Sequence, residues 1–167
     1  MFPRSCKAPA CGVMQWDNPI PVSVVLQPVR VDGAVGLMVV RRAIAPQAGK
    51  LALVGGFLEA HERWQEGGAR EVFEETGVQI VASGLRPFWY VSTEPRHNRV
   101  LLFSVADVLD ASVLAPFVTS AETNERGVIF GAEGLDEVFA FGLHQEAASR
   151  FFAERSVRAP HAYRPLP

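Results

Sequence analysis

The sequence predicts a single α/β domain, and three observations support this prediction. A chain of 167 residues has the size of one domain and can enclose a sizeable core. Short segments rich in β-branched residues, such as 34–42, alternate with polar turns, as strands do. Two segments, 70–76 and 144–155, are expected to be helices, the first ending at Gly77 and the second amphipathic.

Strands make up most of the expected elements. Residues 21–30 have the content of a strand, and the turn 31–33 leads to a hairpin partner at 34–42. The apolar run 51–54 is a short strand ending at Gly55-Gly56, which we interpret as a strand-to-loop turn needing positive φ. Further strands are expected at 78–82, 85–91, 100–106 and 127–131.

The sequence divides into three regions. An extended arm is predicted at 1–19, the main domain at 20–155 and a loose, proline-rich tail at 156–167. A short helical turn at 133–138 precedes the second helix. The apolar side of that helix carries Ala147, Ala148, Phe151 and Phe152.

Composition excludes several classes of function. The formal net charge of −2 argues against a nucleic-acid-binding surface, although a bound metal could still attract a nucleotide. No apolar run approaches the roughly 20 residues that span a bilayer. The N-terminus lacks the apolar core of a secretory signal, so a cytoplasmic location is the default expectation.

Cysteine and histidine contribute little to the expected chemistry. Cys6 and Cys11 cannot complete the four ligands of a structural zinc site, and no histidine lies nearby in the sequence. We favour a metal-free arm over a zinc site shared between chains, and a reducing cytoplasm disfavours a disulfide. The four histidines lack metal-binding spacing and are interpreted as surface or core residues.

Acidic residues concentrate in one stretch. Six of the chain's 18 acidic residues lie within 55–78, opposed only by Arg63 and Arg70. Glu71, Glu74 and Glu75 stand at i, i+3 and i+4, on one helix face, where each like-charge pair costs an isolated helix roughly 0.2–0.5 kcal/mol. The pair Gly67-Gly68 weakens the helix by a further 0.8–1.0 kcal/mol or so per residue. Such violations of local rules favour a functional site.

A divalent cation would relieve this repulsion. Mg²⁺ is usually held by one or two carboxylates, with waters and substrate phosphates completing its shell. The alternative is a solvated acidic helix face. The order of elements around the acids, from strand through diglycine and acidic loop to helix, favours the cation.

The same stretch resembles the Nudix box of the Nudix hydrolases. Gly56, Glu62 and the run Arg70-Glu71-Val72-Phe73-Glu74-Glu75-Thr76-Gly77-Val78 fill its fixed positions. Val54 and His61 depart from residues common in the family, but both lie outside the glutamates. The resemblance implies an α/β/α sandwich with a central mixed sheet. It also implies Mg²⁺- or Mn²⁺-dependent hydrolysis of a nucleoside diphosphate linked to another moiety.

The resemblance and the i, i+4 spacing together assign roles to the acids. Glu71, Glu74 and Glu75 are expected to bind metal, with the backbone of Gly56 as a further ligand. Arg70 is expected to orient a box glutamate, and Glu62 to fix the loop. Mutual repulsion raises proton affinity, which suits one acid to act as general base. The expected catalytic set is Arg70, Glu74, Glu75 and Glu122.

Other candidates lie outside the box. Glu122 resembles a loop glutamate that joins the metal or acts as base in several Nudix subfamilies, and its alternative is a solvated acid. Arg41 and Arg42 either end a strand in solvent or, by the resemblance, face the substrate phosphates. Trp89 is the candidate for stacking on a base. Its neighbours Phe88 and Tyr90 point the other way and are expected in the core.

The resemblance also favours one branch of the family. Asn18-Pro19 and the cysteine pair resemble the end of the N-terminal zinc ribbon of NADH and ADP-ribose pyrophosphatases, without its first cysteine pair. We therefore expect a small nucleotide such as ADP-ribose or NADH as substrate, and the arm and the family favour a homodimer. The alternatives are a pyrophosphatase of damaged nucleoside triphosphates and a non-catalytic nucleotide sensor.

Overall fold

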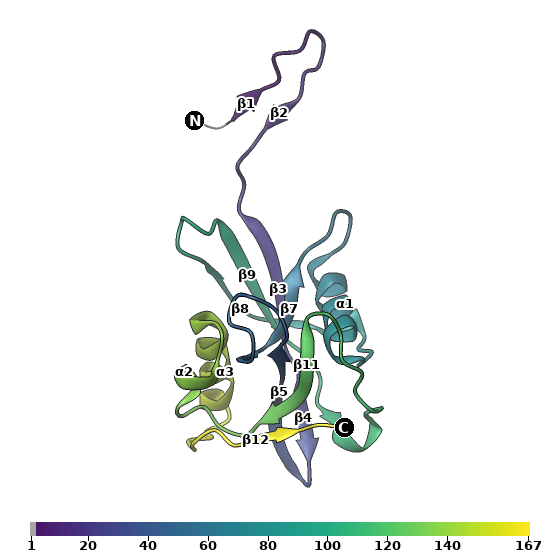
Figure 1. Cartoon of the computed structure of the whole chain (residues 1–167), viewed down its shortest axis with the longest axis vertical. Coiled ribbons are helices and arrows are strands. Elements are labelled where there is room, and N and C mark those ends of the chain that lie inside the picture. The colour runs from purple at the N-terminus through teal and green to yellow at the C-terminus, as the bar shows by residue number, and fades with distance from the viewer. Residues whose placement is uncertain (1–2) are drawn as a thin grey trace.

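Two mixed β-sheets form the centre of the protein, between one helix on one side and two on the other (Figure 1). The computed structural model describes residues 3–167. Helix α1 (Trp64–Thr76) covers one side of the strands, and α2 (Leu135–Val138) and α3 (Gly142–Glu154) cover the other. The expected α/β/α sandwich is confirmed, with its central layer split into two sheets.

The two sheets have different strand orders. One runs β10-β4-β5-β11-β12, with β6 also paired to β5, and the other runs β7-β3-β9-β8. The pairs β3–β9 and β10–β4 are parallel, and the others are antiparallel. The strands are β1 Arg4–Ser5, β2 Met14–Gln15, β3 Ile20–Leu26, β4 Pro28–Val31, β5 Ala34–Arg42, β6 Leu51–Ala52, β7 Val54–Phe57, β8 Arg86–Ser92, β9 Arg99–Val105, β10 Leu109–Asp110, β11 Thr123–Ile129 and β12 Tyr163–Pro165.

The first long strand changes sheet at Gln27. We expected one strand over 21–30, but β3 and β4 belong to different sheets. The buried Gln27 side chain donates from Nε2 to the carbonyls of Pro28 (2.9 Å) and Asp107 (2.8 Å). The backbone carbonyl of Gln27 accepts a hydrogen bond from the backbone N–H of Met38. These bonds satisfy the backbone at the crossing, so the chain passes from one sheet to the other within the core.

Helix α1 begins at Trp64, six residues before the expected start at residue 70. The Glu66 carboxylate accepts a 2.7 Å hydrogen bond from the backbone N–H of Arg63, which caps the first turn. Gly77 ends the helix in the left-handed region, with φ 71°. Gly67 and Gly68 lie inside the helix and are buried. Their missing side chains let α1 approach Ser23 and the loop at Leu58.

The segment after α1 is not the expected strand. Residues 78–82 pair with no strand of the described chain, and the 3₁₀ turn Ala82–Gly84 follows directly. Val78 nevertheless packs into the core beside Val72 of the helix. The apolar character of Val78 therefore reflects burial in the core, whereas Val81 of the same segment is exposed.

Two hydrophobic clusters stabilise the layers. The cluster under α3 contains Ala147, Ala148, Phe151 and Phe152, which confirms the predicted apolar side of this helix. The cluster under α1 contains Val72, together with Val25 and Val54 from the sheet. Each helix thus buries one face against the strands.

The C-terminal tail was expected to be loose, but its last residues are part of a sheet. Strand β12 pairs with β11 in antiparallel register, from Gly127↔Pro165 to Ile129↔Tyr163. Leu166 is buried, and the backbone N–H of this residue donates to the carbonyl of Arg126. Proline content misled the prediction because an edge strand tolerates proline where no ladder donor is needed.

The N-terminal arm is a small hairpin that extends away from the body (Figure 1). Strands β1 and β2 pair in antiparallel register, and the backbone N–H of Cys6 donates to the carbonyl of Val13. Cys6 and Cys11 are free and exposed. Residues 1–2 of the predicted arm lie outside the described residues. No helix among the described residues is long and apolar enough to cross a membrane.

The exposed thiols generate the first prediction. Cys6→Ser is expected to leave the free energy of unfolding unchanged, because the side chain is exposed and the hairpin is held by backbone bonds. Chemical denaturation and zinc analysis of the purified protein check this. Stoichiometric zinc, or a clear loss of stability, would contradict it.

A second prediction concerns His144, which is buried against the rings of Phe103 and Phe141. Burial lowers the pKa of His144 to about 4, and the charge of Arg42 acts in the same direction. The unfolded chain takes up this proton near pH 6.5, so stability is lost as the pH falls from 6.5 towards 4. We expect His144→Gln to remove about 2 kcal/mol of the stability difference between pH 7.5 and pH 5. Urea unfolding at both pH values measures it, and an unchanged difference would contradict it.

Candidate active site

The diglycine Gly55-Gly56 lies inside strand β7, not in the turn that we expected. Both residues pair with β3, in the register Ser23↔Gly56 and Val24↔Gly55. A Cβ atom at Gly55 would overlap the backbone of Ser23 and Val24. Glycine is therefore required here because two backbones approach closely, not because a turn forms.

Gly56 brings the backbone of β7 against the carboxylate of Glu71. A Cβ atom at Gly56 would lie within 2.7 Å of all three atoms of that carboxyl group. Helix α1 packs across β7, and the glutamate points from the helix towards the strand. The predicted proximity of Gly56 to the acidic face is therefore present in the structure.

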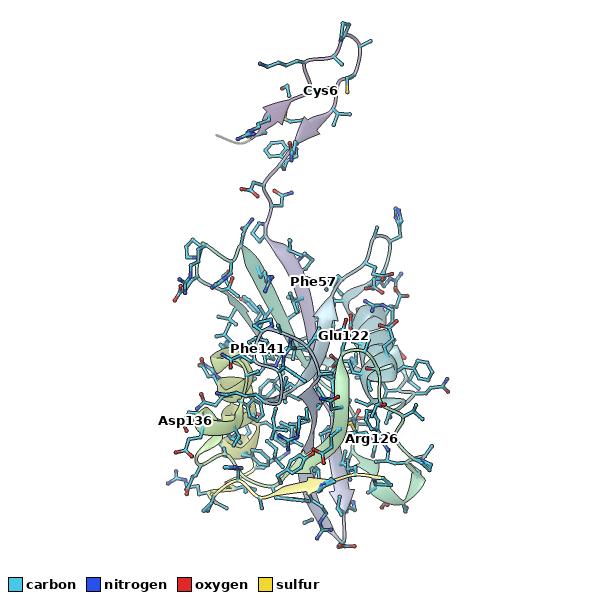
Figure 2. The ribbon with its side chains drawn as sticks, in the orientation of Figure 1. Cys6, Phe57, Glu122, Arg126, Asp136 and Phe141 are labelled. Carbon is cyan, nitrogen blue, oxygen red and sulfur yellow. The ribbon has the colours of Figure 1, made fainter. Side chains whose placement is uncertain are left out.

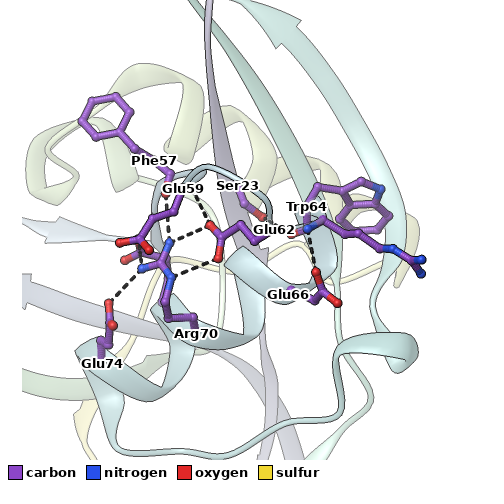
Figure 3. Close-up of polar contacts among 10 residues, drawn as sticks. Ser23, Phe57, Glu59, Glu62, Trp64, Glu66, Arg70 and Glu74 are labelled. Carbon is purple, nitrogen blue, oxygen red and sulfur yellow. Dashed lines mark hydrogen bonds and ion pairs between the residues drawn. The ribbon is translucent and has the colours of Figure 1, made fainter.

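Arg70 lies at the centre of four partners (Figure 3). Its Nη1 donates to Glu71 Oε1 (2.8 Å) and Glu74 Oε2 (2.9 Å). Its Nη2 donates to Glu62 Oε1 (2.9 Å) and to the carbonyl of Phe57 (3.0 Å). The guanidinium lowers the pKa of Glu62, and these carboxylates raise the pKa of Arg70. We predicted from the sequence that Arg70 orients a glutamate, but its hydrogen bond to the Phe57 carbonyl could not be predicted.

Glu75 differs from its neighbours because it forms no ion pair within the described residues. Its Oε2 accepts one hydrogen bond, from the backbone N–H of Gly55 at 3.1 Å. Burial raises the pKa of Glu75 to about 8, and the charges of Glu71 and Glu122 act in the same direction. Burial also raises the pKa of Glu71, against the opposing effect of Arg70. Two adjacent carboxylates thus share a partly buried position with an excess of negative charge.

Glu122 comes near this pair from another part of the chain. It is exposed, just before β11, and its charge affects the pKa of both Glu71 and Glu75. Figure 2 shows it at the end of β11 nearer to α1. Its backbone carbonyl accepts a 2.7 Å hydrogen bond from the N–H of Ala43, which ties its position to the end of β5.

The two arginines at the end of β5 have different surroundings. Arg41 forms a 2.7 Å ion pair with Glu125, which lies opposite it in β11. Arg42 lies over the ring of Phe141, at 5.0 Å, and its charge acts to lower the pKa of Glu75. Of the two arginines, Arg42 is therefore the one whose charge acts on Glu75. The Arg41–Glu125 pair could not be predicted, because it depends on strand register.

Trp89 lies away from the glutamates. Its ring stacks on Phe103 with centroids 5.2 Å apart, and Arg150 lies over it at 4.2 Å. Phe88 packs against the core as expected, whereas Tyr90 is 77% exposed and the core prediction for it is wrong. Around this strand lies an aromatic pocket of about 320 Å³, lined by Trp64, Pro87, Phe88, Trp89, Tyr90, Leu102 and Phe103. None of the clustered acids lines it.

Comparison with known proteins decides the family. The model of the NUDIX domain matches residues 19–150, which is most of the chain. The chain belongs to the NUDIX family. Family membership supports an enzyme that hydrolyses pyrophosphate linkages. No curated protein matches the chain.

Solved structures share this Nudix fold. A NUDIX hydrolase from Nitrosomonas europaea has a TM-score of 0.71 and 25% identity, covering 89% of this chain and 78% of that one. The NUDIX domain of Shewanella oneidensis NrtR, complexed with ADP ribose, has a TM-score of 0.64 and 16% identity over 83% and 89%. A bifunctional NMN adenylyltransferase/ADP ribose pyrophosphatase from Francisella tularensis, complexed with AMP and a Mn ion, has a TM-score of 0.63 and 19% identity over 90% and 44%.

The donor set fits a hard divalent cation. Glu71 and Glu75 offer carboxylate oxygens beside the Gly56 backbone, where a Cβ atom would intrude. Their raised pKa values reflect buried negative charge that a cation would neutralise. Among the described residues, no three His, Cys, Asp or Glu side chains yet form a metal-binding group. Arg70 instead draws Glu62, Glu71 and Glu74 around its own charge.

The two glycines of β7 generate a paired prediction. Gly56→Ala is expected to displace the Glu71 carboxylate and to weaken Mn²⁺ binding by about 10–100-fold, with little change in melting temperature. In Gly55→Ala the new Cβ atom would overlap backbone atoms of β3, and we expect a loss of roughly 1–3 kcal/mol in the free energy of unfolding. Electron paramagnetic resonance of Mn²⁺ and thermal unfolding measure the two effects. Unchanged Mn²⁺ affinity in Gly56→Ala would contradict the site geometry.

Proposed function

We propose that the protein is a metal-dependent hydrolase that cleaves the diphosphate bridge of a nucleoside diphosphate derivative such as ADP-ribose or NADH, by attack of water at phosphorus. One observation carries this proposal: the partly buried pair Glu71 and Glu75 converges on the glycine backbone of β7 without enough positive charge to balance it. This arrangement is unfavourable for a helix with a structural role alone, and such violations of local rules are typical of functional sites.

Specific residues of the chain would hold the cation. Glu71 and Glu75 are the main proposed ligands of Mg²⁺ or Mn²⁺, with Glu74, the Gly56 backbone and Glu122 as further ligands. Once bound, such a cation supplies charge neutralisation at the phosphate oxygens and favours ionisation of water. Arg70 would keep Glu62 while giving up Glu71 and Glu74, because its Nε and Nη2 already bind Glu62.

Other groups of the chain would handle the proton and the substrate. Glu122 suits the role of general base, because it is exposed to solvent and lies within electrostatic range of Glu71 and Glu75. Glu74 and Glu75 remain candidates for the same role. Arg42, close enough to influence Glu75, would face the substrate phosphates, while Arg41 would support it from the ion pair with Glu125.

The substrate class is proposed from two kinds of support. Structures that share the fold include a NUDIX domain complexed with ADP ribose and an ADP ribose pyrophosphatase complexed with AMP and a Mn ion. The arm resembles part of the ribbon of NADH and ADP-ribose pyrophosphatases. Trp89 is the proposed residue for stacking on a planar ring, within the aromatic pocket that it lines, and Arg150 would have to move from its ring to allow this. The homodimer and the cytoplasmic location remain predictions from the sequence.

A substrate panel tests the proposal. ADP-ribose, NADH, dinucleoside polyphosphates and oxidised nucleoside triphosphates are each supplied with Mg²⁺ or Mn²⁺, and released phosphomonoesters are identified. We expect turnover of ADP-ribose or NADH to AMP and a second phosphomonoester, abolished by a chelator. Preference for a triphosphate with release of pyrophosphate would replace the proposed substrate class, and absence of any turnover would reject hydrolysis.

The role of Glu75 gives a further prediction. Glu75→Gln is expected to lower turnover by several orders of magnitude while the fold survives, because the amide cannot supply a charged ligand oxygen. Glu59→Gln, in the exposed part of the same acidic loop, is the matched control and should retain turnover. Steady-state kinetics and circular dichroism measure both variants. Ordinary turnover in Glu75→Gln would remove the assignment.

A further inference from the structure

Arg126 is a buried cation with no acidic partner among the described ion pairs. It lies in the middle of β11 and is 2% exposed. Burial lowers the pKa of its guanidinium, and no neighbouring carboxylate opposes this effect. An arginine buried without an acidic side chain beside it is costly, so other hydrogen bonds must compensate.

Backbone carbonyls supply those bonds. Nη1 donates to the carbonyl of Thr76 at 2.6 Å, and Nη2 donates to the carbonyl of Ala115, at 2.7 Å, and to the main-chain oxygen of Pro167. The ring of Phe117 lies 5.6 Å from the guanidinium and covers it. Nε is buried and has no hydrogen-bond partner within the described chain. One planar side chain therefore joins three segments that are distant in the sequence.

Two of these segments carry proposed site residues. Thr76 is the last residue of α1, next to Glu75, and its carbonyl is at the negative end of the helix dipole, where a cation is favourable. Ala115 begins the loop that leads to Glu122. The third segment is the C-terminal one, whose strand β12 pairs with β11. Figure 2 shows Arg126 on β11, below Glu122 in this view.

We propose that Arg126 is a positioning residue for the active site, which fixes the end of α1 relative to the loop of Glu122. The inference rests on the proposed function, because Glu75 and Glu122 must act together for their relative position to matter. Arg126 itself touches neither carboxylate in the described contacts, and it acts through the Thr76 and Ala115 carbonyls.

A purely structural role makes a different prediction. Replacement of a buried charge by an apolar side chain of similar volume is often neutral or stabilising. If Arg126 only fills space, Arg126→Met should fold well and keep full activity per folded molecule. If Arg126 positions the site, the same variant should fold yet lose activity, because the helix end and the loop are no longer joined.

The experiment compares Arg126→Met, Arg126→Lys and the wild type. For Arg126→Met we expect turnover and Mn²⁺ affinity to fall by about 10–100-fold, as for other residues that orient metal ligands. KM for ADP-ribose should change by less than about twofold, since the groups that bind the rest of the substrate are untouched. Arg126→Lys should recover part of the loss, because lysine keeps the charge without the planar fork of donors.

Arg164→Met, on the neighbouring strand β12, is the matched control, since Arg164 is exposed and pairs with Asp32. It should match the wild type in all three measurements. Wild-type turnover and Mn²⁺ affinity in folded Arg126→Met would overturn the inference. Should Arg126→Met fail to fold, wild-type values in Arg126→Lys would overturn it equally. A wild type that neither binds Mn²⁺ nor hydrolyses any substrate would instead reject the proposed function, and the inference with it.

Discussion

The close approach of the Glu71 carboxylate to the glycine backbone of β7 is the constraint on which the rest of the site depends. Because Gly56 has no side chain, the Glu71 carboxylate can lie against β7, where the backbone N–H of Gly55 also donates to Glu75. Burial then raises the pKa of both carboxyl groups, so ionising them together is unfavourable unless a cation lies beside them. A helix that lay one side chain further from the strand would leave these acids solvated and ordinary.

Two arginines stabilise this arrangement from different places. Arg70 binds Glu62, Glu71 and Glu74 and also the Phe57 carbonyl, so it fixes the acidic loop against the helix. Arg126 binds the carbonyl at the helix end from inside β11. The first is partly exposed and balances charge, whereas the second is buried and joins backbone segments. Together they fix the position of α1 against the central strands.

Local sequence patterns predicted correctly those features that depend on one helix or one strand alone. The buried side of α3 followed from its spacing, and strand β5 has the predicted bounds. The predictions were wrong for segments whose structure depends on contacts with other parts of the chain. Residues 21–30 divide between two sheets at Gln27, and 78–82 forms no strand although Val78 packs into the core beside Val72. The proline-rich tail forms β12 because β11 offers it an edge.

The sequence by itself determined the family, the acidic helix and the grouping of its glutamates, because residues at i, i+3 and i+4 share a face whatever surrounds them. Only the tertiary structure decided that Gly55-Gly56 lies inside a strand, that Arg41 pairs with Glu125 and that Arg126 meets the end of α1. Each of these depends on contacts between segments far apart in the chain. Such contacts follow from register and layer packing, which no local pattern encodes.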